Sequence, residues 1–295
     1  MTLKTGDVIF PEQESNVTIP ESISIFGFSI SFFGLFLVFA ALVGIWMIVR
    51  ESKRKQQNVE WNLTLITLAI VSAIVGGRIY YVLFQWRIFV EEPITLLNLR
   101  GGGLCYFGAL FGAWAVIKRY CRKKDIHFLQ SADTLVFGAA AAAPLVWIGC
   151  AMVREPMGLF YEGVFSVRIS ESYLSGHVEP AYADTLLENA RRVGNESYVS
   201  VHPVALYGLC CSVVIFFILL FFKRKLKVQG DLFSLYLFLN SVTCFVLEFF
   251  RAERCYIWGT GIPVNCVVAT VLVITVTAGW LQRFFEQKKP WEKQL

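Results

Sequence analysis

Charge is scarce in this chain, because charged residues make up only 17% of its 295 residues, against about 25% in a typical soluble domain. It has three histidines, and none lies near enough to its eight cysteines to give a metal-ligand spacing. The cysteines form no Cys-x-x-Cys pair and fall mostly within apolar runs, so we interpret them as small apolar fillers. These shortages exclude a disordered protein and a disulfide scaffold, and no metal site is predicted.

Apolar and aromatic residues are abundant instead. Apolar residues make up 56% of the chain, aromatic residues 15%, and the mean hydropathy is +0.57. This composition excludes a water-soluble protein with a single core and is typical of a membrane protein with aromatic belts. The net charge of +5 comes from short basic blocks between apolar runs, so membrane topology explains it better than a nucleic-acid-binding surface does.

Seven apolar runs are bounded by charge and are near the length of about 20 residues that a bilayer core requires. The predicted fold is therefore an all-α polytopic membrane protein with seven transmembrane helices. The predicted spans are 25–49, 61–86, 102–117, 128–153, 201–222, 231–250 and 261–282. The third span is short and begins at a triple glycine, 101–103.

Lysine and arginine alternate between the two sides of this arrangement. Seventeen lie in segments 50–60, 118–127, 223–230 and 283–295, and only nine lie in the segments of the other side. The positive-inside rule then places the N-terminus outside and the C-terminus in the cytoplasm. We expect one transmembrane domain over 1–282, with an external head at 154–200, and a basic cytoplasmic tail at 283–295. The polar first 24 residues lack a cleavage signal, so we expect the first span to be retained.

The head segment contains one amphipathic pattern, over residues 182–194. Leu186, Ala190 and Val193 recur at helical spacing with charged residues between them, which predicts a short helix. A surface helix without a special role and a helix lying on the outer membrane interface near a substrate fit this pattern equally well.

A charged side chain inside a span costs about 2.5–3.5 kcal/mol to insert, so each one is a candidate functional residue. Arg78 lies in the outer third of the second span. Gly76 and Gly77 precede it and favour close helix packing, which would turn the arginine inward. An arginine that extends to the outer headgroups is the alternative. Asp133, near the inner end of the fourth span, is predicted to be a structural cap or to make a polar contact.

The predicted topology gathers further polar residues at the outer level of Arg78. His202 opens the fifth span, Arg154 ends the fourth, and Glu248 and Arg251 share one helix face at the end of the sixth. Guanidinium groups match phosphate oxygens, so this set predicts a site for an anionic phospholipid headgroup. His202 is the candidate general base, with a purely structural imidazole as the alternative.

Several motifs resemble those of one bacterial enzyme family, the prolipoprotein diacylglyceryl transferases. They are GGRIYYVLF (76–84), GGGLCYFGALFGA (101–113), HPVALY (202–207), LEFFR (247–251) and, in the first span, FSISFFGLF (28–36). The resemblance implies seven transmembrane helices in the bacterial cytoplasmic membrane. It also implies transfer of diacylglycerol from phosphatidylglycerol to the lipobox cysteine at the signal peptide of a prolipoprotein, without a metal or soluble cofactor.

The resemblance also implies roles for individual residues. Arg78 and Glu248 would belong to the lipid-phosphate site, with Arg251 and His202 close by as the other catalytic residues. The expected substrate-binding residues are Tyr81, Gly102, Gly103, Arg154 and Tyr207. The implied partners are phosphatidylglycerol or another anionic phospholipid, a prolipoprotein signal peptide and the membrane, without nucleic acid.

This chain departs from the family pattern at polar positions. Where the family has Tyr, His and two Arg, it has Phe33, Phe107, Trp147 and Cys244, and the Gln and Glu of the histidine-proline motif become Ala205 and Gly208. Arg154 lies seven residues after Trp147, on roughly the same helix face, and is a candidate replacement for the missing arginine. The losses leave a second hypothesis, a non-catalytic lipid- or lipoprotein-binding homologue. A transporter fits least, because no internal repeat is visible.

Overall fold

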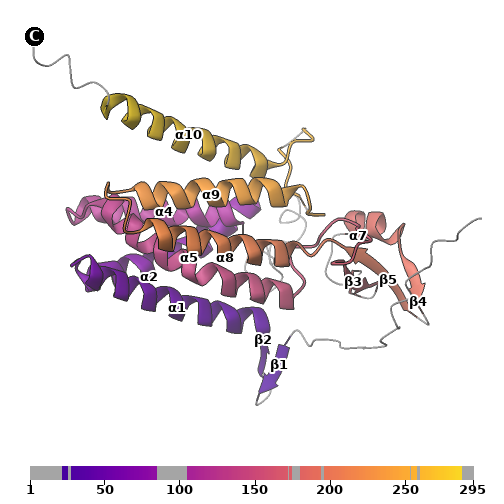
Figure 1. The fold of residues 1–295 in the computed structure, drawn as a ribbon. Coiled ribbons are helices and arrows are strands. Elements are labelled where there is room, and N and C mark those ends of the chain that lie inside the picture. The colour runs from indigo at the N-terminus through magenta and orange to yellow at the C-terminus, as the bar shows by residue number, and fades with distance from the viewer. Residues whose placement is uncertain are drawn as a thin grey trace, which may run out of the picture.

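The computed structural model describes residues 22–25, 28–84, 105–171, 173–174, 180–193, 196–252, 254–257 and 260–287. Long helices lie alongside one another as a bundle, with a small head at one end (Figure 1). The bundle helices are α1 (Phe32–Arg54), α2 (Val59–Phe84), α4 (Tyr106–Lys123), α5 (Phe128–Met152), α8 (Val204–Phe222), α9 (Asp231–Glu248) and α10 (Val264–Gln287).

Six of these helices, all except α4, are long and apolar enough to cross a membrane. The mostly helical fold therefore agrees with the predicted polytopic membrane protein. The predicted third span, 102–117, begins at residues outside the described part, and the helix found there covers 106–123 instead. The second half of α4 is basic, with Lys118, Arg119, Arg122 and Lys123.

Two short strands precede the first bundle helix. Strands β1 (Ser22–Ile25) and β2 (Phe28–Ser31) pair antiparallel, with Ser22 opposite Ser31. Serine alternates with apolar residues here, and this period of two suits a strand. The predicted first span began at residue 25, but the helix begins at Phe32 and continues to Arg54.

The described residues of the head include a three-stranded antiparallel sheet and the short helix α7. The sheet order is β3 (Val167–Ser170), β5 (Glu196–Val201), β4 (Arg191–Val193), and α7 covers Pro180–Leu187. The predicted helix over 182–194 is wrong in its second half, because Arg191–Val193 pairs with β5. Leu186 of the predicted apolar face is buried in the head core, so this face packs within the head.

Glycines bring α2 and α4 into close contact. A Cβ atom built on Gly76 would lie 2.5 Å from the Gly108 carbonyl oxygen, and one on Gly112 would lie 2.5 Å from the Ser72 carbonyl oxygen. Any larger side chain would push the two helices apart. This contact fixes the position of the residues that follow Gly76 on α2, Arg78 among them.

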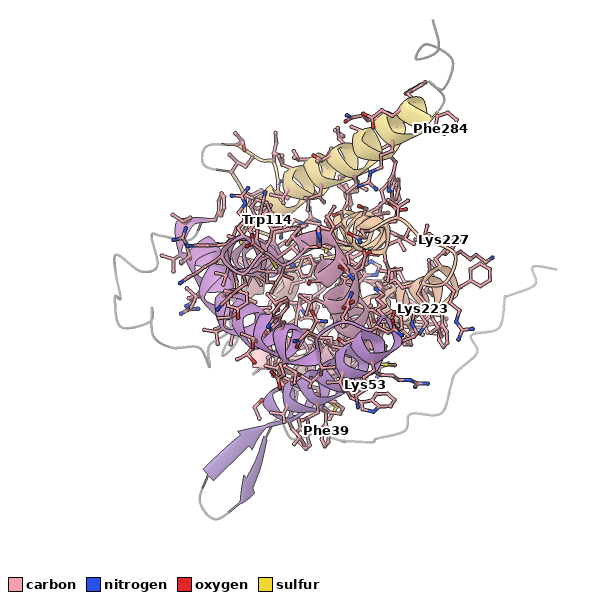
Figure 2. All side chains as sticks on the ribbon, turned by 90° about the vertical axis from the view of Figure 1, so that its left-hand side faces the viewer. Phe39, Lys53, Trp114, Lys223, Lys227 and Phe284 are labelled. Carbon is pink, nitrogen blue, oxygen red and sulfur yellow. The ribbon has the colours of Figure 1, made fainter. Side chains whose placement is uncertain are left out.

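The end of the bundle opposite the head is basic. Figure 2 looks onto this end, where Lys53, Lys223 and Lys227 are labelled. The buried carboxylate of Glu51 accepts a hydrogen bond from Arg54 Nε at 2.8 Å, and Lys223 Nζ approaches it to 3.7 Å. This ion cluster joins the end of α1 to the end of α8.

Asp133 acts as a structural cap, as its position predicts. It lies on α5, is 7% exposed, and accepts hydrogen bonds from the backbone N–H groups of Gly230 and Phe233, both at 2.8 Å. These N–H groups belong to the first turn of α9, where helix donors otherwise lack partners. Asp133 therefore joins α5 to the start of α9.

Replacing Asp133 by alanine should destabilise the fold, because it leaves two N–H groups without acceptors. We expect a loss of about 1–3 kcal/mol in the free energy of unfolding, measured by thermal unfolding in detergent. The control is Asp125→Asn, at an exposed turn residue, which should unfold like wild type. An unchanged melting temperature for Asp133→Ala would contradict the capping role.

Candidate functional site

A buried carboxylate ends α9 on the head side of the bundle. Glu248 is 2% exposed, and Nη1 of Arg251 lies 3.6 Å from one of its carboxylate oxygens. Asn265, at the start of α10, donates from Nδ2 to both carboxylate oxygens, at 3.1 and 3.2 Å. A charge in this position needs such partners, because its desolvation is costly.

Arg251 also connects this carboxylate to the head. Its backbone forms a β-bridge with Gly158, and the Ala252 N–H donates to the Met157 carbonyl oxygen at 2.9 Å. The Arg251 side chain is 33% exposed. The ion pair thus lies where α9, α10 and the head meet.

His202 lies in an aromatic cluster just before α8. Its ring stacks on Tyr161 at a centroid distance of 4.1 Å and meets Phe250 edge-on at 5.0 Å. Its Nδ1 shares a hydrogen bond of 3.2 Å with the Tyr207 hydroxyl. Burial lowers the pKa of His202 below its usual value, so the imidazole is neutral at neutral pH.

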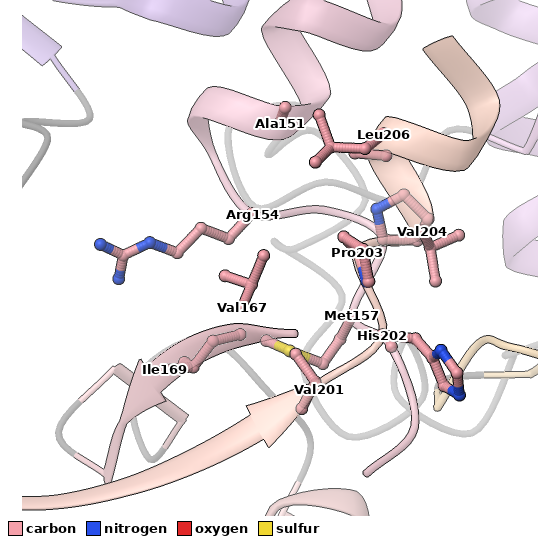
Figure 3. A pocket seen from close by; sticks show the side chains of 13 residues that line it. Ala151, Arg154, Met157, Val167, Ile169, Val201, His202, Pro203, Val204 and Leu206 are labelled. Carbon is pink, nitrogen blue, oxygen red and sulfur yellow. The ribbon is translucent and has the colours of Figure 1, made fainter. Parts of the chain in front are cut away.

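Arg154 and His202 lie on opposite sides of a small cavity of about 50 Å³. Figure 3 shows the Arg154 guanidinium and the His202 ring pointing away from each other, with apolar side chains such as Val167 between them. The Arg154 guanidinium lies over the ring of Tyr173 at 4.9 Å. The structure therefore does not bring these two predicted site residues together.

Arg78 lies on α2 with its guanidinium 5.7 Å from the centroid of the Tyr81 ring. The helix is held against the start of α4, where the Cys105 N–H donates to the Gly77 carbonyl oxygen at 3.3 Å. Gly102 and Gly103, the other predicted substrate-binding residues of this region, lie outside the described residues.

Of the predicted residues, the structure joins Glu248 to Arg251 and His202 to Tyr207, whereas Arg78 and Arg154 each lie over an aromatic ring. Sequence reasoning missed Asn265, whose signal was a lone amide in an apolar run at the level of Glu248. It also missed Tyr161 and Phe250, because nothing in the sequence connects them to His202.

Two of the departures from the family pattern are in direct contact. A Cβ atom built on Gly208 would lie only 2.4–2.6 Å from three atoms of the Trp147 ring, so the indole covers this glycine. By the motif resemblance, Trp147 stands where the family pattern has an arginine, and Gly208 where it has a glutamate. A large ring against a glycine thus occupies the place where the pattern has two charged side chains.

Comparisons with known proteins point to one family. The family model for prolipoprotein diacylglyceryl transferase matches residues 20–282. Curated phosphatidylglycerol--prolipoprotein diacylglyceryl transferases are similar over most of their length. The protein of Shouchella clausii is 28% identical over 266 residues, 89% of each chain, and that of Geobacillus kaustophilus is 28% identical over 268 residues, 90% of this chain and 91% of its own. That of Lactobacillus acidophilus is 25% identical over 277 residues, 93% of each chain.

Replacing Gly208 by alanine should destabilise the protein by about 1–3 kcal/mol, because the new methyl group displaces the Trp147 ring. Thermal unfolding in detergent measures the loss. In a Trp147→Ala background the same change should cost much less, because the clash is gone. Gly279→Ala is the control, since a Cβ atom there meets nothing within 4 Å. An equal cost in both backgrounds would show that the ring contact is not its cause.

Proposed function

Because this chain belongs to the prolipoprotein diacylglyceryl transferase family, we propose that it transfers the diacylglyceryl group of phosphatidylglycerol to the cysteine thiol of a prolipoprotein. The curated relatives with this activity in their names align with about nine-tenths of the chain. The buried Glu248, held by Arg251 and Asn265 at the head end of the bundle, is the observation that supports this function best.

In this proposal Arg251 and Arg78 bind the lipid phosphate, and Arg154 contributes from the end of α5. Glu248 accepts hydrogen bonds from Asn265 and forms an ion pair with Arg251, and so holds the guanidinium in place. Positive charge placed in advance stabilises the negative charge that develops on the leaving group. Tyr81, Gly102, Gly103 and Tyr207 complete the proposed substrate-binding set.

His202 serves as the general base. In the tautomer whose Nδ1–H donates to the Tyr207 hydroxyl oxygen, Nε2 is the free acceptor and takes the proton from the substrate thiol, whose pKa is near 8.5 in a free cysteine. The thiolate sulfur then attacks the glyceryl carbon that bears the phosphate ester. A carbon–sulfur bond forms, the carbon–oxygen bond breaks, and glycerol phosphate leaves with the electron pair.

The proposed orientation places the head outside and the basic end of the bundle in the cytoplasm of a bacterial cell, with the protein in the cytoplasmic membrane. Helix α4 is then the seventh span, with its apolar half beside α2 and its basic half at the inner surface. Residues 1–282 form one transmembrane domain with its head insertion at 154–200, and 283–295 form the basic tail. The signal peptide of the prolipoprotein is the proposed second substrate.

One observation favours a second candidate function, a non-catalytic homologue that binds the lipid. Trp147 packed on Gly208 and the buried Phe107, 1% exposed, place apolar groups where the family pattern has charged or polar ones. Complementation of a transferase-depleted bacterium separates the two candidates. Growth supports the transferase, and bound phospholipid without turnover or growth supports the binding homologue.

Transfer is tested with the purified protein, phosphatidylglycerol and a lipobox peptide. Wild type should form the thioether-linked product, and Arg78→Ala should lower kcat/KM by about 10²-fold or more, since a charge-assisted hydrogen bond is lost near the phosphate. Arg119→Ala, an exposed arginine in the basic half of α4, is the matched control and should react like wild type. Equal rates for both variants would reject the role of Arg78.

The rate of transfer should depend on pH through His202. Because burial lowers the pKa of His202, the base stays neutral through neutral pH, and the rate should fall on acidification with a midpoint below about 6.5. His202→Gln should lose this acid limb together with most of the rate, and His127→Gln, at the opposite end of the bundle, should keep both. If the fall in rate at acid pH persists in His202→Gln, another residue is the general base.

A further inference from the structure

Two buried polar atoms of the described residues have no hydrogen-bond partner, the Tyr80 hydroxyl and Nε of Arg251. A buried polar group without a partner costs about 1–3 kcal/mol, and a charged one costs more. In a membrane protein the hydrocarbon offers no replacement partner. Such atoms therefore need a specific explanation. One bound polar ligand could accept a hydrogen bond from each of them.

The two residues have neighbours in common, Glu248 at the end of α9 and Cys105 just before α4. Tyr80 lies within electrostatic range of Glu248, Cys105 and Cys255. Arg251 is ion-paired with Glu248 and lies within electrostatic range of Cys105. Cys105 is itself tied to α2 by its hydrogen bond to Gly77, three residues before Tyr80.

Close packing holds the Tyr80 ring in this place. A Cβ atom on Gly108 of α4 would lie 2.3 Å from the Tyr80 Cβ atom, so the start of the side chain lies directly on the glycine. The ring also contacts Phe84 at a centroid distance of 4.8 Å. These contacts limit the rotamers of Tyr80, so its hydroxyl cannot easily turn away to find another partner.

We propose that Tyr80 is a further substrate-binding residue, whose hydroxyl donates a hydrogen bond to the phosphodiester of the bound phospholipid beside the Nε–H of Arg251. This proposal rests on the proposed function and adds to it a residue that the motif resemblance does not assign. A phosphodiester carries one negative charge on two non-bridging oxygens. Its two oxygens can accept one hydrogen bond from the Tyr80 hydroxyl and one from the Nε–H of Arg251, so a single ligand provides a partner for both atoms.

The test measures phospholipid binding by the full-length protein in detergent, for wild type, Tyr80→Phe and Tyr120→Phe. Tyr80→Phe keeps the ring and removes only the hydroxyl, so the fold is preserved. Its dissociation constant for phosphatidylglycerol should rise about 10-fold, the loss expected for one hydrogen bond to a charged group. Tyr120, on the basic half of α4, is the control, and its variant should bind like wild type.

Three further measurements make the outcome decisive. Binding of neutral diacylglycerol, which lacks the phosphate, should be the same in Tyr80→Phe and wild type. In the transfer assay Tyr80→Phe should raise KM for phosphatidylglycerol more than it lowers kcat. The shift in melting temperature that phosphatidylglycerol produces should be smaller in Tyr80→Phe, although the lipid-free variant is no less stable, because an unpaired hydroxyl is gone.

Unchanged affinity of Tyr80→Phe for phosphatidylglycerol would overturn the proposal, as would an equal loss of diacylglycerol binding. Inorganic phosphate is a further probe. If it stabilises wild type as strongly as phosphatidylglycerol does at the same concentration, the site binds a free anion and the lipid assignment is wrong. A protein that binds phosphatidylglycerol but transfers nothing would defeat the proposed function, and the binding data would still decide the role of Tyr80.

Discussion

A carboxylate that leaves water loses its hydration and needs polar partners within the protein, and this constraint organises the head end of the molecule. Glu248 holds Arg251 and Asn265, which come from the segment after α9 and from the start of α10. Arg251 in turn bridges to the head through its backbone. The end of α9, the start of α10 and the head therefore meet at one ion pair. The aromatic cluster around His202 lies next to it, because Phe250 belongs to this cluster and directly precedes Arg251.

The opposite end of the bundle follows the same rule with another set of residues. Glu51 is buried among Arg54, Lys55 and Lys223, and Asp133 is satisfied by two N–H groups at the start of α9. Between the two ends, helices approach through glycines, as at Gly76 and Gly108. Hydrocarbon gives little hydrophobic driving force for helix association, so close contact and buried polar pairs fix the arrangement instead.

Most of the bundle was predictable, because length and hydropathy largely decide where a chain crosses a bilayer. The span predicted at 128–153 ends within a residue of α5, and the one at 231–250 within two residues of α9. The first span was misplaced because hydropathy does not separate the strand β2 from the helix after it. The head sheet was missed because its three strands are short. The pairing of Glu248 with Arg251 followed from their spacing, but contacts such as Tyr161 with His202 join distant segments and leave no local signal.

The contact between Trp147 and Gly208 links two departures that look independent along the sequence. Restoring glutamate at 208 alone would drive a charged side chain into the indole, and restoring arginine at 147 alone would leave a guanidinium facing a glycine that cannot pair with it. A charged residue at either position is therefore disfavoured unless the other position changes with it. The two positions are therefore coupled, and substitutions at 147 and 208 should show a non-additive effect on stability.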